Sequence, residues 1–477
     1  MRRKNSFKLV ALIFICSVYA ACKIPQVTQR EGNQSLPKQF GNTSDTSTIK
    51  LMTWRSFFTD PRLDNLIDTA LKNNQDLNIT LQDIEMARNE IRIRKGDLLP
   101  IVGYYAGAGA EKVGRFTSQG AGDASADITP GKGVPDILPN YHFGLQANWE
   151  VDVWHKLRNA KKAAVTRYLS TVEGKNFVVT NLVAEVANNY YELLAEDNQL
   201  EIVRQNIALQ SNALELMKIQ MQATRVTALA VKQFEAQVLG SKSLQFDILQ
   251  NMTETENKIN FLLGRFPQPI LRDRNAFAIL VPSVVETGIP SQLLDNRPDV
   301  KQAAYDLAAS KLDVKIARAA FYPSIAISAG VGYQAFNPKY LIRTPESLLY
   351  SLAGDLAGPL INRNAIKADY LTANAKQLQA VFNYERSILN GYIEVANQVS
   401  NINNLQKKYD LKSQQVNALT QSIEFSNDLF KSARADYFEV LMTQRDALQS
   451  KLDLIDTKKA QLNAVVSIYQ ALGGGWE

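Results

Sequence analysis

Two stretches of the chain, 209 residues apart, carry the same long series of apolar residues at seven-residue spacing. This repeat constrains the fold more than any other feature. The first series is Val172, Val179, Val186, Leu193, Leu200, Ile207, Leu214 and Met221, and the second is Val381, Ile388, Val395, Ile402, Tyr409, Val416, Ile423 and Phe430. A strict seven-residue spacing is typical of a helix whose apolar stripe packs against a partner in a left-handed coiled coil. The segment of roughly 65 residues before Arg225 would be on the order of 100 Å long as a helix. The sequence therefore predicts a long helical bundle or tube built from a duplicated unit.

The duplication extends N-terminal to the heptads with a different offset. Asp76–Leu77 corresponds to Asp299–Val300, and Pro100 corresponds to Pro323, both at an offset of 223 residues. The fall from 223 to 209 means that the first half holds 14 extra residues, which we place in the Gly-, Ser-, Asp- and Pro-rich segment 113–138. The period is too long for a solenoid repeat of about 20–50 residues. We therefore predict two complete repeats, at 60–280 and 281–477.

The N-terminus has the pattern of an export signal. Four basic residues precede the apolar run 9–15, and the pattern closes at Ala20–Ala21–Cys22, so residues 1–21 are predicted to be a signal peptide. The segment is too short to span a bilayer. Its removal lowers the formal charge of the chain from +6 to +2. The basic balance therefore gives no reason to expect a nucleic-acid partner.

Cys22 follows two small residues, in a pattern that resembles the cleavage box of bacterial lipoproteins. That resemblance implies that the mature chain begins at an acylated cysteine, and two or more acyl chains give stable membrane anchoring. Residues 22–59 would then be the lipid anchor and an extended, polar tether. The alternative is an ordinary signal peptide followed by an incidental cysteine. In either case the mature chain has one cysteine and no disulfide.

Four segments alternate apolar and polar residues and are predicted to be strands, at about 101–112, 140–153, 323–334 and 346–358. Each is long enough to cross a bilayer when tilted. No segment outside the signal peptide has 18 continuous apolar residues, so a membrane crossing would require a closed β-barrel. The alternative is a pair of soluble hairpins packed on the helices.

Four strands cannot close a barrel, because the smallest barrels have about eight. Open strand edges are not tolerated in lipid, so the chain is expected to oligomerise, and three copies would supply twelve strands. At the other end of each long helix, polar segments at about 223–228 and 432–437 are predicted to be helical hairpin tips.

Five motifs in order along the chain resemble one family, the TolC-like outer-membrane efflux factors, specifically the lipoprotein branch that serves tripartite pumps of the resistance-nodulation-division (RND) type. The motifs lie at 66–77, 149–154, 296–300, 317–325 and 471–476. The resemblance implies an α+β membrane protein that forms a homotrimer, in which a 12-stranded β-barrel in the outer membrane is continued by a 12-helix periplasmic α-barrel. It also implies a periplasmic adaptor (membrane fusion) protein and an inner-membrane RND pump as partners.

The resemblance also implies site residues. Matching 437–445 to the family pattern places Glu439 and Met442 at the periplasmic constriction, where Met442 replaces the usual Asp. The alternative for Glu439 is a solvated helix charge. Contacts with the adaptor are expected at the tips, at Arg225, Thr227, Arg434 and Asp436.

The sequence offers no pattern of catalysis. The two histidines, His142 and His155, lie far from any Cys–His cluster, and no phosphate-binding loop or G-x-S-x-G motif is present. We therefore predict a passive conduit for small molecules such as drugs or metals, with no enzyme activity, metal or cofactor. The alternatives are the exit duct of a type I secretion system and a structural helical lipoprotein without a pore.

Overall fold

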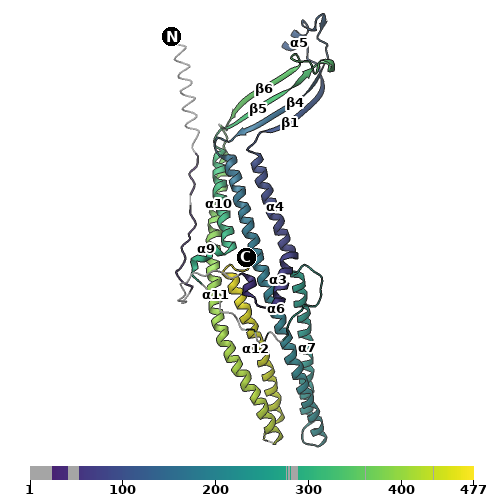
Figure 1. The fold of residues 1–477 in the computed structure, drawn as a ribbon, viewed down its shortest axis with the longest axis vertical. Coiled ribbons are helices and arrows are strands. Elements are labelled where there is room, and N and C mark those ends of the chain that lie inside the picture. The colour runs from purple at the N-terminus through teal and green to yellow at the C-terminus, as the bar shows by residue number, and fades with distance from the viewer. Residues whose placement is uncertain are drawn as a thin grey trace. The chain divides into compact units, whose positions relative to one another are not determined.

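The computed structural model describes residues 24–28, 30–40, 53–274, 277, 280, 288–359, 361–432 and 434–476 (Figure 1). The predicted signal peptide and Cys22 lie outside this part of the chain. Contacts divide the chain into two compact units, each with residues of both predicted repeats. Of the described residues, unit 1 comprises those within Met1–Glu31, Met86–Tyr168 and Tyr305–Val381, and unit 2 comprises those within Gly32–Glu85, Leu169–Ala304 and Phe382–Glu477.

Long helices dominate the described chain. The helices are α2 (Trp54–Phe57), α3 (Pro61–Asn73), α4 (Gln75–Gly96), α5 (Ser118–Asp123), α6 (Lys156–Gln222), α7 (Ala228–Leu262), α9 (Leu293–Asn296), α10 (Pro298–Ala319), α11 (Asn364–Lys431) and α12 (Tyr437–Ala471), with short 3₁₀ helices η1 (Pro290–Gln292) and η2 (Pro338–Tyr340). The strands are β1 (Ile101–Glu111), β2 (Asp127–Thr129), β3 (Lys132–Gly133), β4 (Leu138–Val151), β5 (Ser324–Ala335) and β6 (Leu348–Ala357).

The two halves of the chain repeat each other closely in local structure. Helices α7 and α12 are both 35 residues long and begin 209 residues apart. Helices α6 and α11 have 67 and 68 residues, as the heptads predict. Of the sixteen heptad positions, Met221 alone is exposed, at 37%. The apolar stripe therefore identifies the packed side of each long helix.

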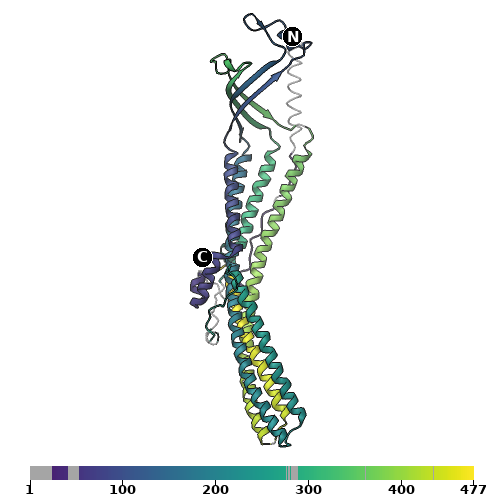
Figure 2. The same cartoon turned by 90° about the vertical axis from the view of Figure 1, so that its right-hand side faces the viewer.

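Unit 1 contains an antiparallel four-stranded sheet in the order β1-β4-β5-β6. The central pair joins the two repeats, because β4 belongs to the first and β5 to the second; Trp149 pairs with Ile327 in this ladder. Strands β1 and β6 each have one partner in the described chain and form the edges of the sheet (Figure 1). Figure 2 shows the same sheet turned by 90°. Helices α4 and α10 precede β1 and β5, while α6 and α11 follow β4 and β6. All four helices therefore join the same end of the sheet.

Two facing glycines make room for a tyrosine on this sheet. Gly144 on β4 pairs with Gly332 on β5, and Tyr105 on β1 pairs with Gly144. A Cβ atom at either glycine would lie 2.8 Å from the Tyr105 hydroxyl oxygen, which is too close for any real contact. The Tyr105 ring therefore lies flat across both neighbouring strands and covers the two glycines.

Unit 2 holds the main apolar core. Helices α3, α6, α7 and α12 contribute to one cluster of buried side chains, which includes Leu63, Ile67, Leu193 and Ile259, all 0% exposed. Pro61 begins α3, and the Asp60 carboxylate caps this helix by accepting from the Arg62 N–H at 2.9 Å. The other Asp60 oxygen accepts from the buried Tyr190 hydroxyl at 2.5 Å. This pair of bonds fixes the start of α3 against α6.

Candidate functional site

The sheet of unit 1 separates apolar from polar side chains. One face carries Val102, Tyr104, Phe143, Leu145, Trp149, Val151, Ile325, Ile327, Val331, Tyr333, Leu348, Tyr350, Leu352 and Leu356. The other carries mostly polar and small residues, among them His142, Gln146, Asn148, Glu150, Ser324, Ser328, Gln334, Ser351 and Asp355. Tyr104, Tyr350 and Leu352 are 88%, 82% and 78% exposed, so the described chain leaves this part of the apolar face uncovered. A sheet of this kind can lie between lipid and water.

The 149–154 motif ties β4 to the helices. The Trp149 indole N–H donates to the Leu98 carbonyl at the end of α4, and the Trp154 indole N–H donates to the Pro323 carbonyl before β5. Between them, the Asp152 carboxylate accepts from the backbone N–H groups of Leu157 and Arg158, at 2.9 Å each. Asp152 is only 6% exposed and caps the first turn of α6. Each polar side chain thus has a positioning role, which the sequence did not reveal.

The 296–300 motif builds a buried charge cluster in unit 2. The Arg297 guanidinium is 6% exposed and pairs with Asp299 at 2.7 Å and with Glu394 of α11 at 2.6 Å. It also donates to the Ala471 carbonyl at 2.8 Å, at the last residue of α12. Burial lowers the pKa of Arg297, but these partners outweigh it and raise the pKa above its usual value. Arg297 therefore fastens the end of α12 to α11 and to the beginning of α10.

The predicted tips are exposed turns with the same backbone bonds. At the first tip, the Arg225 N–H donates to the Gln220 carbonyl; at the second, the Arg434 N–H donates to the Leu429 carbonyl, both at 2.8 Å. The caps differ. The Thr227 hydroxyl accepts from the Ala230 N–H, whereas the side chain of Asp436 makes no capping bond.

Side chains from both hairpins pack together near these tips. Leu214 and Met217 of α6 and Val231, Phe234 and Val238 of α7 form a buried cluster. Phe430, Tyr437 and Leu441, from the second hairpin, pack against it. The tip residues predicted to contact an adaptor are therefore displayed on a packed base.

Glu439 lies in the first turn of α12 and is exposed, while Met442, one turn later, is half-buried. The Glu439 backbone N–H donates to the Asp436 carbonyl at 3.1 Å, and the Glu439 carbonyl accepts from the Thr443 hydroxyl. Within the residues that the structure describes, the Glu439 carboxylate has no ion-pair partner. The role of both residues in a constriction stays a prediction.

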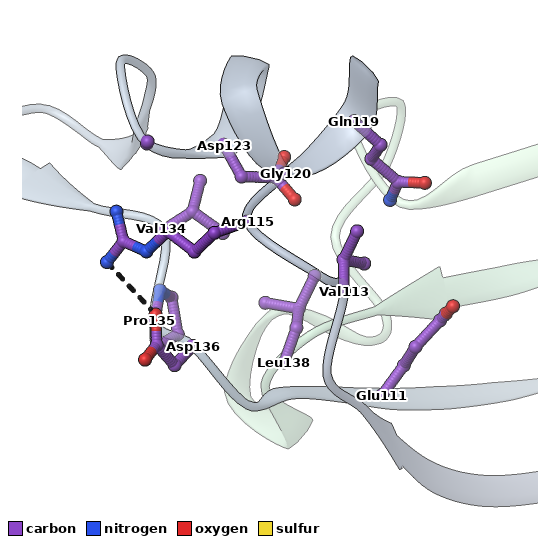
Figure 3. Close-up of a pocket in the computed structure, with 11 residues that line it drawn as sticks. Glu111, Val113, Arg115, Gln119, Gly120, Asp123, Val134, Pro135, Asp136 and Leu138 are labelled. Atoms are coloured by element: carbon purple, nitrogen blue, oxygen red, sulfur yellow. Dashed lines mark hydrogen bonds and ion pairs between the residues drawn. The ribbon is translucent and has the colours of Figure 1, made fainter. Parts of the chain in front are cut away.

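The segment predicted to be an insertion folds as a small structure between β1 and β4. It contains α5, whose first turn is capped by the Thr117 hydroxyl, and the β2–β3 hairpin. A cavity of about 50 Å³ lies in this segment, and its lining includes Arg115 and Asp136, which form an ion pair at 3.1 Å. Figure 3 shows the lining residues and this ion pair. The lining includes the carboxylates of Glu111, Asp123 and Asp136 together with the Arg115 guanidinium.

No group of three or more potential metal ligands comes together in the described part of the chain. None of the described helices is both long and apolar enough to cross a membrane.

Curated relatives match the chain along nearly its full length. The pyoverdine export outer membrane protein OpmQ of Pseudomonas aeruginosa is 28% identical over 477 residues, covering 99% of this chain and 98% of OpmQ. The cation efflux system protein CusC of Escherichia coli is 26% identical, covering 89% of this chain and 88% of CusC. The probable outer membrane lipoprotein SilC of Salmonella typhimurium is 25% identical, covering 92% and 93% of the two chains.

Solved structures share the fold. A crystal structure of CusC superimposes with a TM-score of 0.81 at 24% identity, covering 95% of this chain and 99% of that one. The open state of the MtrE outer membrane channel of Neisseria gonorrhoeae gives a TM-score of 0.81 at 22% identity, covering 96% and 99%. The fold is that of the outer-membrane efflux channels.

Residues 66–265 and 289–474 match the outer membrane efflux protein family, and the chain belongs to that family. It is an outer-membrane efflux channel, as the five motifs predicted. The relatives are transport proteins by name.

Proposed function

We propose that this chain is the passive exit conduit of a tripartite efflux pump, without enzyme activity of its own, through which small molecules leave the periplasm. The observation that carries the proposal is the sheet with one apolar and one polar face, joined at one end to four helices. The polar face bounds a water-filled path. Pyoverdine and cations are named as the cargo of relatives, so the same channel fold serves unrelated solutes. The inner-membrane pump, and not the channel, therefore selects the exported solute.

The working channel is a homotrimer. Strands β1 and β6 each leave one row of backbone groups without a partner in the described chain, and such edges are not tolerated in lipid. Pairing β1 of one copy with β6 of the next closes the barrel, and three copies give twelve strands, above the minimum of about eight. A periplasmic adaptor contacts the tips, around Arg225, Thr227, Arg434 and Asp436. Domain boundaries at 60–280 and 281–477 remain our proposal for the two repeats.

Reconstitution into planar bilayers tests the conduit directly. We expect stepwise ion conductance from the purified protein, with a mass in detergent equal to three chains. A folded, membrane-inserted protein that never conducts would identify a structural lipoprotein instead. A stable monomer or dimer that conducts would contradict the edge-pairing argument.

Glu439→Gln is expected to lower the cation selectivity of the channel and to weaken block by multivalent cations. Three copies of this exposed carboxylate would face one another at the periplasmic opening, and their repulsion would favour binding of cations there. The measurements are reversal potential in a salt gradient and current block. Glu150→Gln is the comparison and should have the smaller effect, because the channel is expected to be wider at the level of the sheet, where Glu150 lies. Unchanged selectivity and block in a normally conducting Glu439→Gln channel would identify Glu439 as a solvated charge.

Cys22→Ser is expected to abolish metabolic labelling of the protein by a radioactive fatty acid. The hydroxyl of serine cannot form the thioether through which a lipoprotein cysteine carries its diacylglyceryl group. The measurement compares labelled protein with total protein in membranes, and Cys16→Ser, within the predicted signal peptide, is the control. Equal labelling of wild type and Cys22→Ser would contradict the anchor.

A further inference from the structure

A cavity of about 820 Å³ lies in unit 1 where the apolar face of the sheet meets the first turns of α6. Trp149 and Val151 of β4 and Val165 of α6 give it an apolar wall. Arg158, Lys161 and Lys162 of α6 line it as well. Residues 158, 161, 162 and 165 share one side of the helix, because side chains three and four positions apart are neighbours there.

The positive charge of this cavity is only partly neutralised. Its one lining carboxylate, Asp152, is occupied by two backbone N–H groups and lies 3.4 Å from the Arg158 guanidinium. Lys161 and Lys162 have no carboxylate within ion-pair distance among the residues that the structure describes. The cavity therefore combines an apolar wall with two uncompensated ammonium groups, and no contact within the described chain uses that combination.

The apolar wall continues beyond the cavity along the sheet. Trp149 pairs with Ile327 and Val151 pairs with Ile325 in the β4–β5 ladder, so all four side chains are on the same face. This face contacts lipid in an outer-membrane channel. The helices join the sheet at this end, which is therefore the periplasmic end. The cavity thus lies at the level of the headgroups of the periplasmic leaflet, where tryptophan is favoured.

We propose that this cavity binds the phosphodiester headgroup of an anionic phospholipid of the phosphatidylglycerol type from the periplasmic leaflet. The headgroup phosphate lies between Lys161 and Lys162, and the acyl chains lie along Trp149, Val151, Ile325 and Ile327. Charge complementarity favours an anionic headgroup over a zwitterionic one, because a basic site near a membrane surface attracts anionic lipid through each lysine. The apolar wall favours a lipid over a free anion.

Native mass spectrometry of the purified trimer tests the proposal. The protein is incubated with phosphatidylglycerol or with phosphatidylcholine of the same acyl chains, and retained lipid is counted. We expect phosphatidylglycerol to be retained preferentially. Lys161→Gln/Lys162→Gln should reduce that retention by roughly tenfold or more. Lys407→Gln/Lys408→Gln, which removes two exposed lysines of α11 in unit 2, is the charge-matched control and should retain lipid like the wild type.

Three outcomes would overturn the lipid site. Equal retention of the two lipids would mean that the headgroup charge is not recognised. An equal loss in the control would mean that only the net charge of the protein matters. Displacement of phosphatidylglycerol by millimolar inorganic phosphate would identify a site for free anions. Normal conductance of Lys161→Gln/Lys162→Gln in planar bilayers shows that the variant is folded, which separates this proposal from that of the conduit.

Discussion

Arg297→Met is expected to lower the free energy of unfolding by about 3–5 kcal/mol, because it removes the cation from a buried ion-pair cluster. Methionine fills a similar volume but leaves Asp299, Glu394 and the Ala471 carbonyl without their shared donor. Glu394 is 54% exposed and recovers some hydration, which places the loss toward the lower end of that range. The change is measured as a shift of the thermal or urea midpoint of the trimer in detergent.

Two further variants make the Arg297 prediction specific. Arg297→Lys keeps the charge but cannot hold two partners in the same planar geometry, so its loss should be smaller than that of methionine. Arg445→Met removes an arginine from an exposed pair with Asp446 and should cost no more than about 1 kcal/mol. If Arg297→Met unfolds at the same midpoint as Arg445→Met, the cluster does not stabilise the fold.

Glu196→Gln is expected to stabilise the protein at pH 8 by about 2 kcal/mol and to have little effect near pH 4.5. Burial, assisted by the neighbouring carboxylate Glu192, raises the pKa of Glu196 to about 7, despite a hydrogen bond from Thr255 and the charges of Lys459 and Arg272. Glu196 is 4% exposed, and its Oε2 atom has no partner among the described residues.

The direction of this pKa shift determines how the stability of the folded state depends on pH. The folded state prefers the protonated carboxyl, so the stability that this group contributes is complete below its unfolded pKa of about 4.3. That stability is lost as the pH rises through about 7. Glutamine is neutral throughout and escapes the loss. Unfolding midpoints from pH 4.5 to 8 measure the effect, and Glu201→Gln, an exposed carboxylate of the same helix, is the control. If the unfolding midpoints of Glu196→Gln and wild type differed by the same amount at every pH from 4.5 to 8, the raised pKa of Glu196 would be contradicted.

Sequence reasoning succeeded where a local period decided the structure. The heptads identified α6 and α11, and the alternation of side chains identified β1, β4, β5 and β6. Each of these features repeats within a few residues, so it can be recognised without knowledge of the neighbours in space.

The contacts between distant segments could not be predicted in this way. Arg297 meets Glu394 and Ala471 across 97 and 174 residues, and nothing near Arg297 in the sequence indicates either partner. The same is true of Trp154 and the Pro323 carbonyl, 169 residues away. The segment 113–138 was predicted only as an insertion, because its short helix and hairpin carry no apolar period. The position of Lys161 and Lys162 of α6 beside the end of the sheet likewise depends on the fold.

The unlike caps of the two tips have a consequence for symmetry. A homotrimer presents six helical turns that share one backbone hydrogen bond, and around the ring a turn closed by the Thr227 hydroxyl alternates with one that displays the uncapped Asp436 carboxylate. A docking protein with one kind of binding surface therefore meets two kinds of position, three that display Arg225 and Thr227 and three that display Arg434 and Asp436. Six copies of that docking protein must either bind both kinds of position equally or divide into two nonequivalent sets of three. In the second case, identical copies would dissociate from the ring at two different rates.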